Sequence, residues 1–134
     1  MKVIYDAEEA VVGRLGTSVA KDLLKGKSVF IINSEKAIVS GDKKVIIERI
    51  SDLRKKGGTS RKGPKVSKIP ERLLKRMIRG MLPWDRQKGR DAYKRLKCFV
   101  GVGDLKEEDL KNLKKVQHTK PNRYITIKQI SEAL

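Results

Sequence analysis

The chain lacks the cysteines that a disulfide or a structural zinc site would need. Its 134 residues include one cysteine, Cys98, and one histidine, His118. A lone cysteine excludes a disulfide within the chain, and one Cys with one His falls short of the four ligands of a usual structural zinc site. Cys98 lies in the apolar run Cys98-Phe99-Val100, so we expect a buried, unreactive thiol. We expect no metal, no cofactor and no small-molecule substrate, and the missing disulfides suit the reducing cytoplasm.

Long apolar runs are also missing. No stretch approaches the ~18 consecutive apolar residues that are typical of a membrane-spanning helix. The opening residues MKVIYDAEEA become acidic at Asp6, where the apolar core of a signal peptide would continue. We therefore expect no membrane association, no secretory leader and a cytoplasmic location.

Negative charge is scarce, with 16 Asp and Glu against 33 Lys and Arg and a net charge of +17. Heat adaptation is an alternative source of high charge density, but it enriches Glu alongside Lys and leaves the signs nearly balanced. A twofold excess of one sign repels itself in a compact chain, and binding to a polyanion relieves that repulsion. Nucleic acid is the commonest such partner.

Hydrophobic periodicity in the first 53 residues predicts strands that alternate with helices. Val29 to Ile32 form a continuous apolar run, which favours a central strand of a parallel sheet. Asp42 is placed to cap the helix that follows it. We expect strands within 2–7, 27–34 and 36–42, and helices at 13–25 and 43–53. This order predicts one α/β domain over residues 1–134, with a mainly parallel central sheet flanked by helices.

The pattern breaks at residue 54. The stretch RKKGGTSRKGPKVSK, residues 54–68, has three glycines, one proline and seven basic residues but no acid, which predicts a loop. Beyond it we expect helices at 70–81 and 85–97, a buried strand at 98–102, a helix that begins at a capping box of Asp104 and Glu107, a strand at 123–127, and a terminal helix capped by Thr126 with Gln129.

The positive charge is concentrated in residues 54–97, which we call the basic segment. It holds 17 Lys and Arg against three acids, a net +14, whereas the other 90 residues carry only +3. Lys and Arg neutralise phosphates and release condensed counterions. Trp84 and Tyr93 are suited either to stacking on exposed bases or to core packing. The predicted RNA-binding residues are Arg54, Lys55, Lys56, Arg61, Lys62, Lys65, Lys68, Arg72, Lys75, Arg76, Arg79, Trp84, Arg86, Lys88, Arg90, Lys94, Arg95 and Lys97.

Two further kinds of function are considered beside RNA binding. The first is a metal-dependent RNA-processing enzyme that uses Asp6, Glu8, Glu35 and Asp42. The second is a peripheral membrane protein that uses the amphipathic helix at 71–81. The sequence Gly26-Lys27-Ser28 matches only the end of a phosphate-binding loop, because Lys21 stands where the first glycine belongs. No arrangement of residues indicates a catalytic triad, so we expect no enzymatic activity.

Three blocks of the sequence resemble the ribosomal protein L13 family of the large subunit. They are DAEEAVVGRLGTSVAKDLLKGK, INSEKAIVSGDK and IRGMLPWDRQKGRDAYKRLKCFVG, in the order of the family. The third is the most specific, through Arg79-Gly80-Met81-Leu82-Pro83, Gly89-Arg90, Tyr93, Arg95-Leu96-Lys97 and Gly101. The blocks span most of residues 6–101, and the last third of the chain matches less distinctively.

The resemblance implies a single α/β domain, bound to large-subunit rRNA and to neighbouring ribosomal proteins, that supports subunit assembly without catalysis. It also implies that the RNA-facing elements are residues 54–68 and 72–97. The spacer WDRQK before Gly89 is longer than in the bacterial form, and the bacterial lead-in before the first strand is absent. Both departures are similar to the archaeal and eukaryotic branch, and the short C-terminal end resembles archaeal members.

Overall fold

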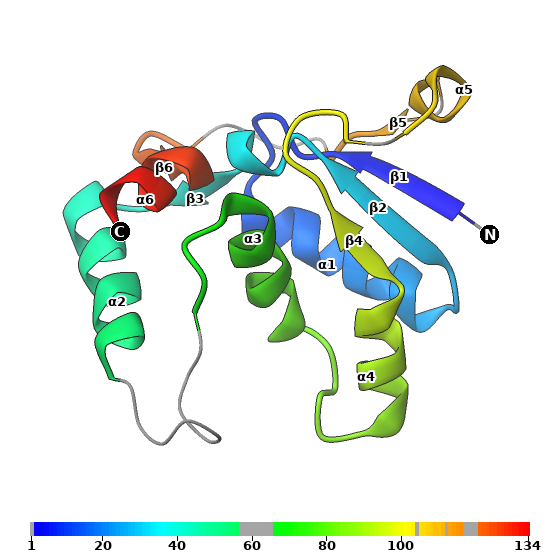
Figure 1. Cartoon of the computed structure of the whole chain (residues 1–134), viewed down its shortest axis with the longest axis horizontal. Coiled ribbons are helices and arrows are strands. Elements are labelled where there is room, and N and C mark those ends of the chain that lie inside the picture. Colours follow the sequence, from blue (N-terminus) through cyan, green and yellow to red (C-terminus); the bar gives the residue numbers. More distant parts are fainter. Residues whose placement is uncertain (1, 57–65, 104, 112, 117–120) are drawn as a thin grey trace.

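The computed structural model describes residues 2–56, 66–103, 105–111, 113–116 and 121–134. Four strands form a parallel sheet in the order β4-β2-β1-β5, as Figure 1 shows. These strands are β1 (Lys2–Asp6), β2 (Ser28–Ile32), β4 (Leu96–Cys98) and β5 (Leu113–Lys114). The predictions of a single α/β domain, a mainly parallel sheet and a central strand at 29–32 are confirmed, since β2 lies between β4 and β1.

The remaining elements surround this sheet. Strands β3 (Ile38–Ser40) and β6 (Tyr124–Thr126) pair antiparallel in a second, two-stranded sheet. This small sheet, α2 (Lys43–Lys55) and α6 (Ile127–Ala133) lie together at one end of the molecule in Figure 1. A 3-10 turn, η1 (Ser34–Lys36), joins β2 to β3.

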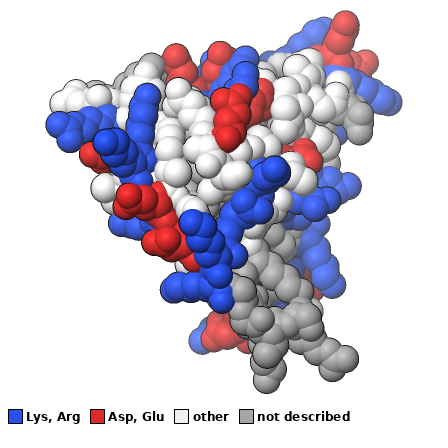
Figure 2. Space-filling view, turned by 60° about the vertical axis from the view of Figure 1, so that its left-hand side comes forward, with Lys and Arg blue, Asp and Glu red and all other residues white. Residues whose placement is uncertain are grey.

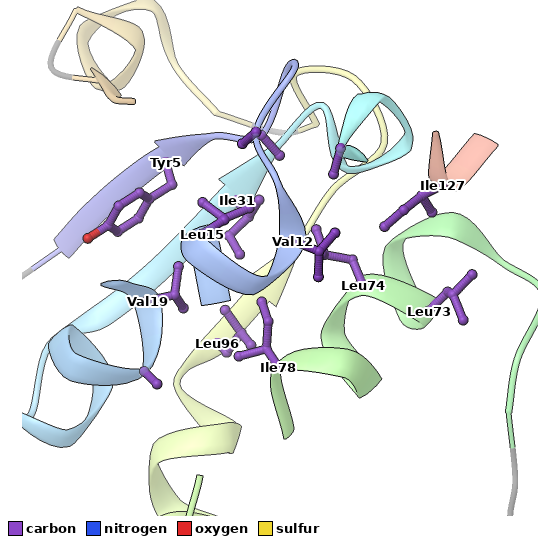
Figure 3. Packing of buried hydrophobic residues seen from close by; sticks show 14 of the residues in the cluster. Tyr5, Val12, Leu15, Val19, Ile31, Leu73, Leu74, Ile78, Leu96 and Ile127 are labelled. Carbon is purple, nitrogen blue, oxygen red and sulfur yellow. The ribbon is translucent and has the colours of Figure 1, made fainter. Parts of the chain in front are cut away.

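Three helices pack on one face of the parallel sheet: α1 (Val12–Leu24), α3 (Pro70–Arg79) and α4 (Gln87–Lys94) (Figure 1). Side chains alternate across a strand, so Tyr5, Ile31 and Leu96 share the helix-covered face. Figure 3 shows these side chains packed with Leu15 of α1 and with apolar residues of α3. The predicted α1 stripe is confirmed, because Leu15, Val19 and Leu23 are fully buried.

Two predicted caps are present. The Asp42 side chain accepts a hydrogen bond from the Lys44 amide at the start of α2. At α6, the Thr126 hydroxyl accepts from the Gln129 amide, and the Gln129 side chain accepts from the Thr126 amide. Each cap satisfies helix N–H groups that have no partner within the helix, so local sequence fixes where these helices begin.

The predictions for residues 85–102 are partly wrong. The second helix is shorter than expected, because α4 ends at Lys94 and strand β4 starts at Leu96. The strand expected at 98–102 is displaced, since Val100 and Val102 are 48% and 44% exposed. Gly101 and Gly103 have φ of 66° and 65°, which extended backbone does not adopt, so the chain turns there. Leu96, which was expected within the helix at 85–97, lies in β4 and is buried beside Val29 across the sheet.

Smaller corrections concern other element ends. Helix α2 continues to Lys55, past the expected break at residue 54, and α3 stops at Arg79, before Pro83. The expected capping box at Asp104 lies outside the described residues. Helix α5 (Glu107–Leu110) follows Lys106, has no side-chain cap, and leads into β5, which the sequence did not predict. None of the helices within the described ranges is long and apolar enough to cross a membrane.

Candidate nucleic-acid interface

Helix α3 separates apolar and basic residues onto different faces. Pro70 occupies its first turn, where the missing N–H costs nothing. Leu73, Leu74 and Ile78 are buried in the core (Figure 3), whereas the basic side chains remain exposed or half-exposed. These basic residues are Arg72, Lys75, Arg76 and Arg79. The helix therefore holds four cations at fixed spacing, because its opposite face is anchored.

Helix α4 is brought close to the turn that precedes it by a glycine. A Cβ atom at Gly89 would overlap the Pro83 carbonyl, so only glycine allows this approach without a shift of the backbone. The Arg90 Nε then donates to the Trp84 carbonyl at 3.1 Å, and Gln87 donates to Asp91 at 3.0 Å. The turn and helix α4 thus form one rigid unit.

Aromatic rings connect α3 to this unit. The Arg79 guanidinium lies 4.0 Å from the centroid of the Trp84 ring, and Lys75 Nζ lies 4.6 Å from that of Tyr93. The two rings meet edge to face at 5.2 Å. We call Lys75, Arg79, Trp84 and Tyr93 the cation–aromatic cluster. Such contacts stabilise both partners and restrict the motion of long cationic side chains.

Electrostatics within the cluster follow from partial burial and from like charges. Burial lowers the pKa of Arg79, and the nearby charge of Arg76 lowers it further. Burial likewise raises the pKa of the Tyr93 hydroxyl. Arg79 stays charged at neutral pH because the ordinary pKa of a guanidinium is so high. Tyr93 packs against the hydrophobic core, so core packing, one of the two roles predicted for it, is confirmed, and Trp84 is half-buried with its ring edge to face on Tyr93.

The basic segment has no acidic partners within the part of the chain that the structure describes. The ion pairs there involve Lys2, Lys27, Lys36, Lys114 and Lys115, all of which lie outside 54–97. Figure 2, which looks toward the end of the molecule that carries α2 and α6, shows Lys and Arg atoms with Asp and Glu atoms among them. The described cations of the basic segment, at 54–56 and 66–97, therefore form no ion pair with a carboxylate.

The predicted RNA-binding residues differ in what they already contact. Arg54 Nε donates to the Val66 carbonyl at 3.1 Å. Arg61, Lys62 and Lys65 lie outside the described residues. The members whose side chains are exposed to solvent, and so accessible to a phosphate, include Lys55, Lys56, Lys68, Arg72, Arg86, Lys88, Lys94 and Lys97.

Arg95 stands apart from the others. Its Nη2 donates to the Leu23 carbonyl at 2.7 Å, at the C-terminal end of α1, and its Nε is buried without a hydrogen-bond partner. This contact ties the start of β4 to α1. Arg95 thus has a structural role inside the chain, which the charge pattern of the sequence did not indicate.

The acids that an RNA-processing enzyme would use do not converge. Asp6 accepts from Asn33 and from the Glu8 amide and lies near Lys115, and Glu35 accepts from the Gly101 amide. Asp42 caps α2. No group of three His, Cys, Asp or Glu suited to a metal occurs among the described residues. Asp6, Glu35 and Asp42 each have a structural task.

The structure supports neither a membrane-binding role for α3 nor a phosphate-binding loop at residues 26–28. The apolar stripe of α3 that a membrane would need is part of the core. The sequence Gly26-Lys27-Ser28 follows α1 and leads into β2, whereas a phosphate-binding loop leads from a strand into a helix.

One aromatic pair was not expected from the sequence. Phe99 was predicted to lie in a buried strand, but it is half-exposed and stacks on Phe30 with ring centroids 6.1 Å apart and planes 7° from parallel. Lys97 Nζ lies 6.0 Å from the Phe30 ring centroid. Side chains alternate between the two faces of a strand, and Leu96 faces the core. Had a strand been expected from Leu96 onward, Lys97 and Phe99 would have been placed together on the opposite face.

Comparisons with known proteins agree with these observations. A family model described as Ribosomal protein L13 matches residues 1–105. The protein named large ribosomal subunit protein uL13 from Archaeoglobus fulgidus is 37% identical over 135 residues, which cover 98% of this chain and 86% of the relative. The one from Methanocaldococcus jannaschii is 39% identical over 134 residues, with 98% and 96% covered. The one from Methanosarcina barkeri is 46% identical over 100 residues, with 74% and 71% covered.

Proposed function

The chain belongs to the ribosomal protein L13 family, and we propose that its basic segment is the surface that binds large-subunit rRNA. As a family member it is a structural constituent of the large ribosomal subunit. The relatives that carry this name come from archaea, which fits the archaeal-type features of the sequence.

One observation carries the proposal. Among the described residues, the cations of 54–97 form no ion pair with a carboxylate, and this segment carries +14 of the net charge whereas the other 90 residues carry only +3. Uncompensated cations on a folded surface repel one another and lower stability. Contact with phosphates removes that repulsion and releases counterions, which makes binding favourable and dependent on salt.

The anchoring of α3 and α4 supports a role in recognising RNA shape. The cation–aromatic cluster holds Lys75 and Arg79 in place before binding, so less side-chain entropy is lost on contact. An A-form RNA helix is recognised mainly through its backbone and shape, which suits cations at fixed spacing. The exposed cations of α4 extend the same surface.

The family role implies further features of this protein. It works in the cytoplasm as part of the ribosome, contacts neighbouring proteins of the large subunit and supports subunit assembly. We propose a role without catalysis, since the family is one of structural ribosomal proteins.

The proposal is tested by comparing two variants that lose the same charge. The first replaces Arg76, Arg86, Lys88 and Lys94 with Gln. The second replaces Lys21, Lys25, Lys106 and Lys111, exposed cations outside the basic segment, with Gln. Affinity for deproteinised large-subunit rRNA is measured from low to physiological salt.

We expect the first variant to bind more weakly and to show a flatter slope of log K against log salt. Each lost phosphate contact reduces the slope by roughly 0.7–0.9, so the loss of four cations should reduce it by about three. The second should keep nearly the native slope. Equal effects of both variants would mean that net charge alone drives binding, and the assignment of this surface would be wrong.

A further inference from the structure

A cleft opens along the outer edge of the parallel sheet. Strand β4 is the terminal strand of the sheet on that side, and α3 lies beside it (Figure 1). The cleft has a volume of about 400 Å³, within the range of roughly 300–1,000 Å³ typical of small-ligand sites. It is lined by Glu71, Arg72, Lys75, Lys97, Cys98 and Phe99.

The lining combines the groups that a nucleotide requires. Arg72, Lys75 and Lys97 supply three cations for phosphate oxygens, against the single carboxylate of Glu71. Phe99 supplies an aromatic ring, and unpaired bases stack on such rings in RNA-binding proteins. A net positive lining favours a phosphate-bearing occupant over an uncharged or acid-poor peptide.

Phe99 is held rigidly at this place. Its ring stacks on Phe30, and a Cβ atom at Gly103 would lie 2.6 Å from it, so the ring rests directly on the glycine backbone. Lys2 Nζ lies 4.8 Å from the centroid of the Phe30 ring, on the same face of the sheet as Lys97. The half-exposed Phe99 ring is therefore fixed against Phe30 and Gly103, and the adjoining Phe30 ring is bordered by Lys2 and Lys97.

The strand edge adds polar groups from the backbone. The Arg95 carbonyl accepts from the Val29 amide, and the Phe99 amide donates to the Ile31 carbonyl. Because hydrogen-bonding directions alternate along a strand, the backbone N–H and C=O of Cys98 point away from β2, toward the open edge. A donor and an acceptor next to a stacking ring are suited to the edge of a base.

From these observations we propose that the cleft binds one unpaired nucleotide of the large-subunit rRNA. Its base lies against Phe99 and its phosphate among Arg72, Lys75 and Lys97. Lys75 belongs both to the cation–aromatic cluster and to the lining of the cleft. The proposed RNA-binding surface on α3 and α4 is therefore continuous with the cleft at the edge of the sheet. This inference rests on the proposed function, because it assumes that the chain binds rRNA.

The test uses the full chain with deproteinised large-subunit rRNA from an archaeal relative. Phe99→Leu removes the aromatic face but keeps an apolar side chain on Gly103, and Phe99→Tyr restores the ring. Val102→Ala, at an exposed neighbouring position, is the matched control. Affinity, salt slope and thermal unfolding are measured for each, and ultraviolet crosslinks of the wild-type complex are mapped to peptides and nucleotides.

We expect Phe99→Leu to weaken binding about fivefold or more with an unchanged salt slope, because base stacking carries no charge. Phe99→Tyr and Val102→Ala should bind like the wild type. Arg72→Gln should flatten the slope by about one. A crosslink should join one unpaired nucleotide to residues 97–99, and this crosslink decides the matter if Phe99→Leu does not fold.

Failure of the inference is distinguishable from failure of the proposed function. If the wild type does not bind rRNA, the proposed function is wrong. The proposed function stands if the wild type binds rRNA and the variant with four Gln substitutions in the basic segment binds more weakly. If Phe99→Leu then binds like Val102→Ala, and no nucleotide crosslinks to 97–99, only the nucleotide cleft is refuted. In intact subunits, a crosslink from 97–99 to a neighbouring protein instead of a nucleotide would also refute it.

Discussion

The Arg79 guanidinium carbon lies 4.0 Å from the centroid of the Trp84 ring, so the last turn of α3 is clamped to the turn before α4. This contact adds to the core packing that already joins these two parts of the basic segment through Ile78 and Leu82. Trp84 is the single tryptophan of the chain, which makes its fluorescence a direct reporter of the contact.

We predict that Trp84→Leu lowers the free energy of unfolding by about 1–3 kcal/mol, since both the cation–π contact and the edge contact with Tyr93 are lost. Trp84→Phe should retain most of this stability. Chemical denaturation measures both values. In the native protein, Arg79→Gln should change the Trp84 emission, and an unaltered spectrum would mean that the two side chains do not meet in solution.

Gly89 is predicted to be intolerant of any side chain. Gly89→Ala places a methyl group on the Pro83 carbonyl. We therefore expect the free energy of unfolding to fall by about 1–3 kcal/mol and RNA binding to weaken. Gly13→Ala is the matched control, because nothing lies within 4 Å of its Cβ position in α1. It should be neutral or stabilising by up to about 1 kcal/mol. Similar melting temperatures for the two variants would contradict the close approach.

Arg95 and Lys94 are neighbours with opposite predicted roles. Arg95→Gln removes the hydrogen bond to the Leu23 carbonyl, so stability should fall by about 1.5–3 kcal/mol with little change in the salt slope of RNA binding. Lys94→Gln should leave stability unchanged and flatten the slope by about one. Thermal unfolding and salt titration separate the two effects, and an interchange of the results would reverse our assignment.

The thiol of Cys98 is predicted to react slowly in the native protein, although the residue is half-buried and lines the cleft beside Phe99. Burial raises the pKa of Cys98 to about 12, from an ordinary value near 9. Maleimide labelling at pH 8 should therefore be much slower in the native chain than in the urea-unfolded chain, because thiolate is the reactive form. Comparable labelling rates would show that the thiol is exposed.

The same pKa shift predicts how stability depends on pH. Between about pH 9 and pH 12 the unfolded chain loses the Cys98 proton while the folded chain retains it, so stability falls as pH rises through this window. Cys98→Ala should reduce the slope of unfolding free energy against pH there. An unchanged slope would assign the pH dependence to other groups.

Sequence pattern and structure differ most clearly around β4. From the sequence, Leu96 could belong either to the end of the helix expected at 85–97 or to a strand. The local pattern cannot decide between the two, because a buried apolar side chain at this position fits both. Pairing with β2 decides it, since Leu96 lies beside Val29 in the parallel ladder. The aromatic pair of Phe30 and Phe99 was not predicted for the same reason, as its two rings come from segments far apart in the chain.

By itself, the sequence determined the α/β class, the helix starts at Asp42 and Thr126, and the concentration of positive charge in 54–97. These depend on neighbours along the chain: apolar spacing, capping residues and the count of ionisable groups. Only the tertiary structure decided that Arg95 is held by Leu23, that Lys75 and Arg79 rest on aromatic rings, and that a cleft lies beside Phe99. Those contacts join residues that sequence spacing does not connect, and they form only once α1, α3, α4 and β4 pack around one core.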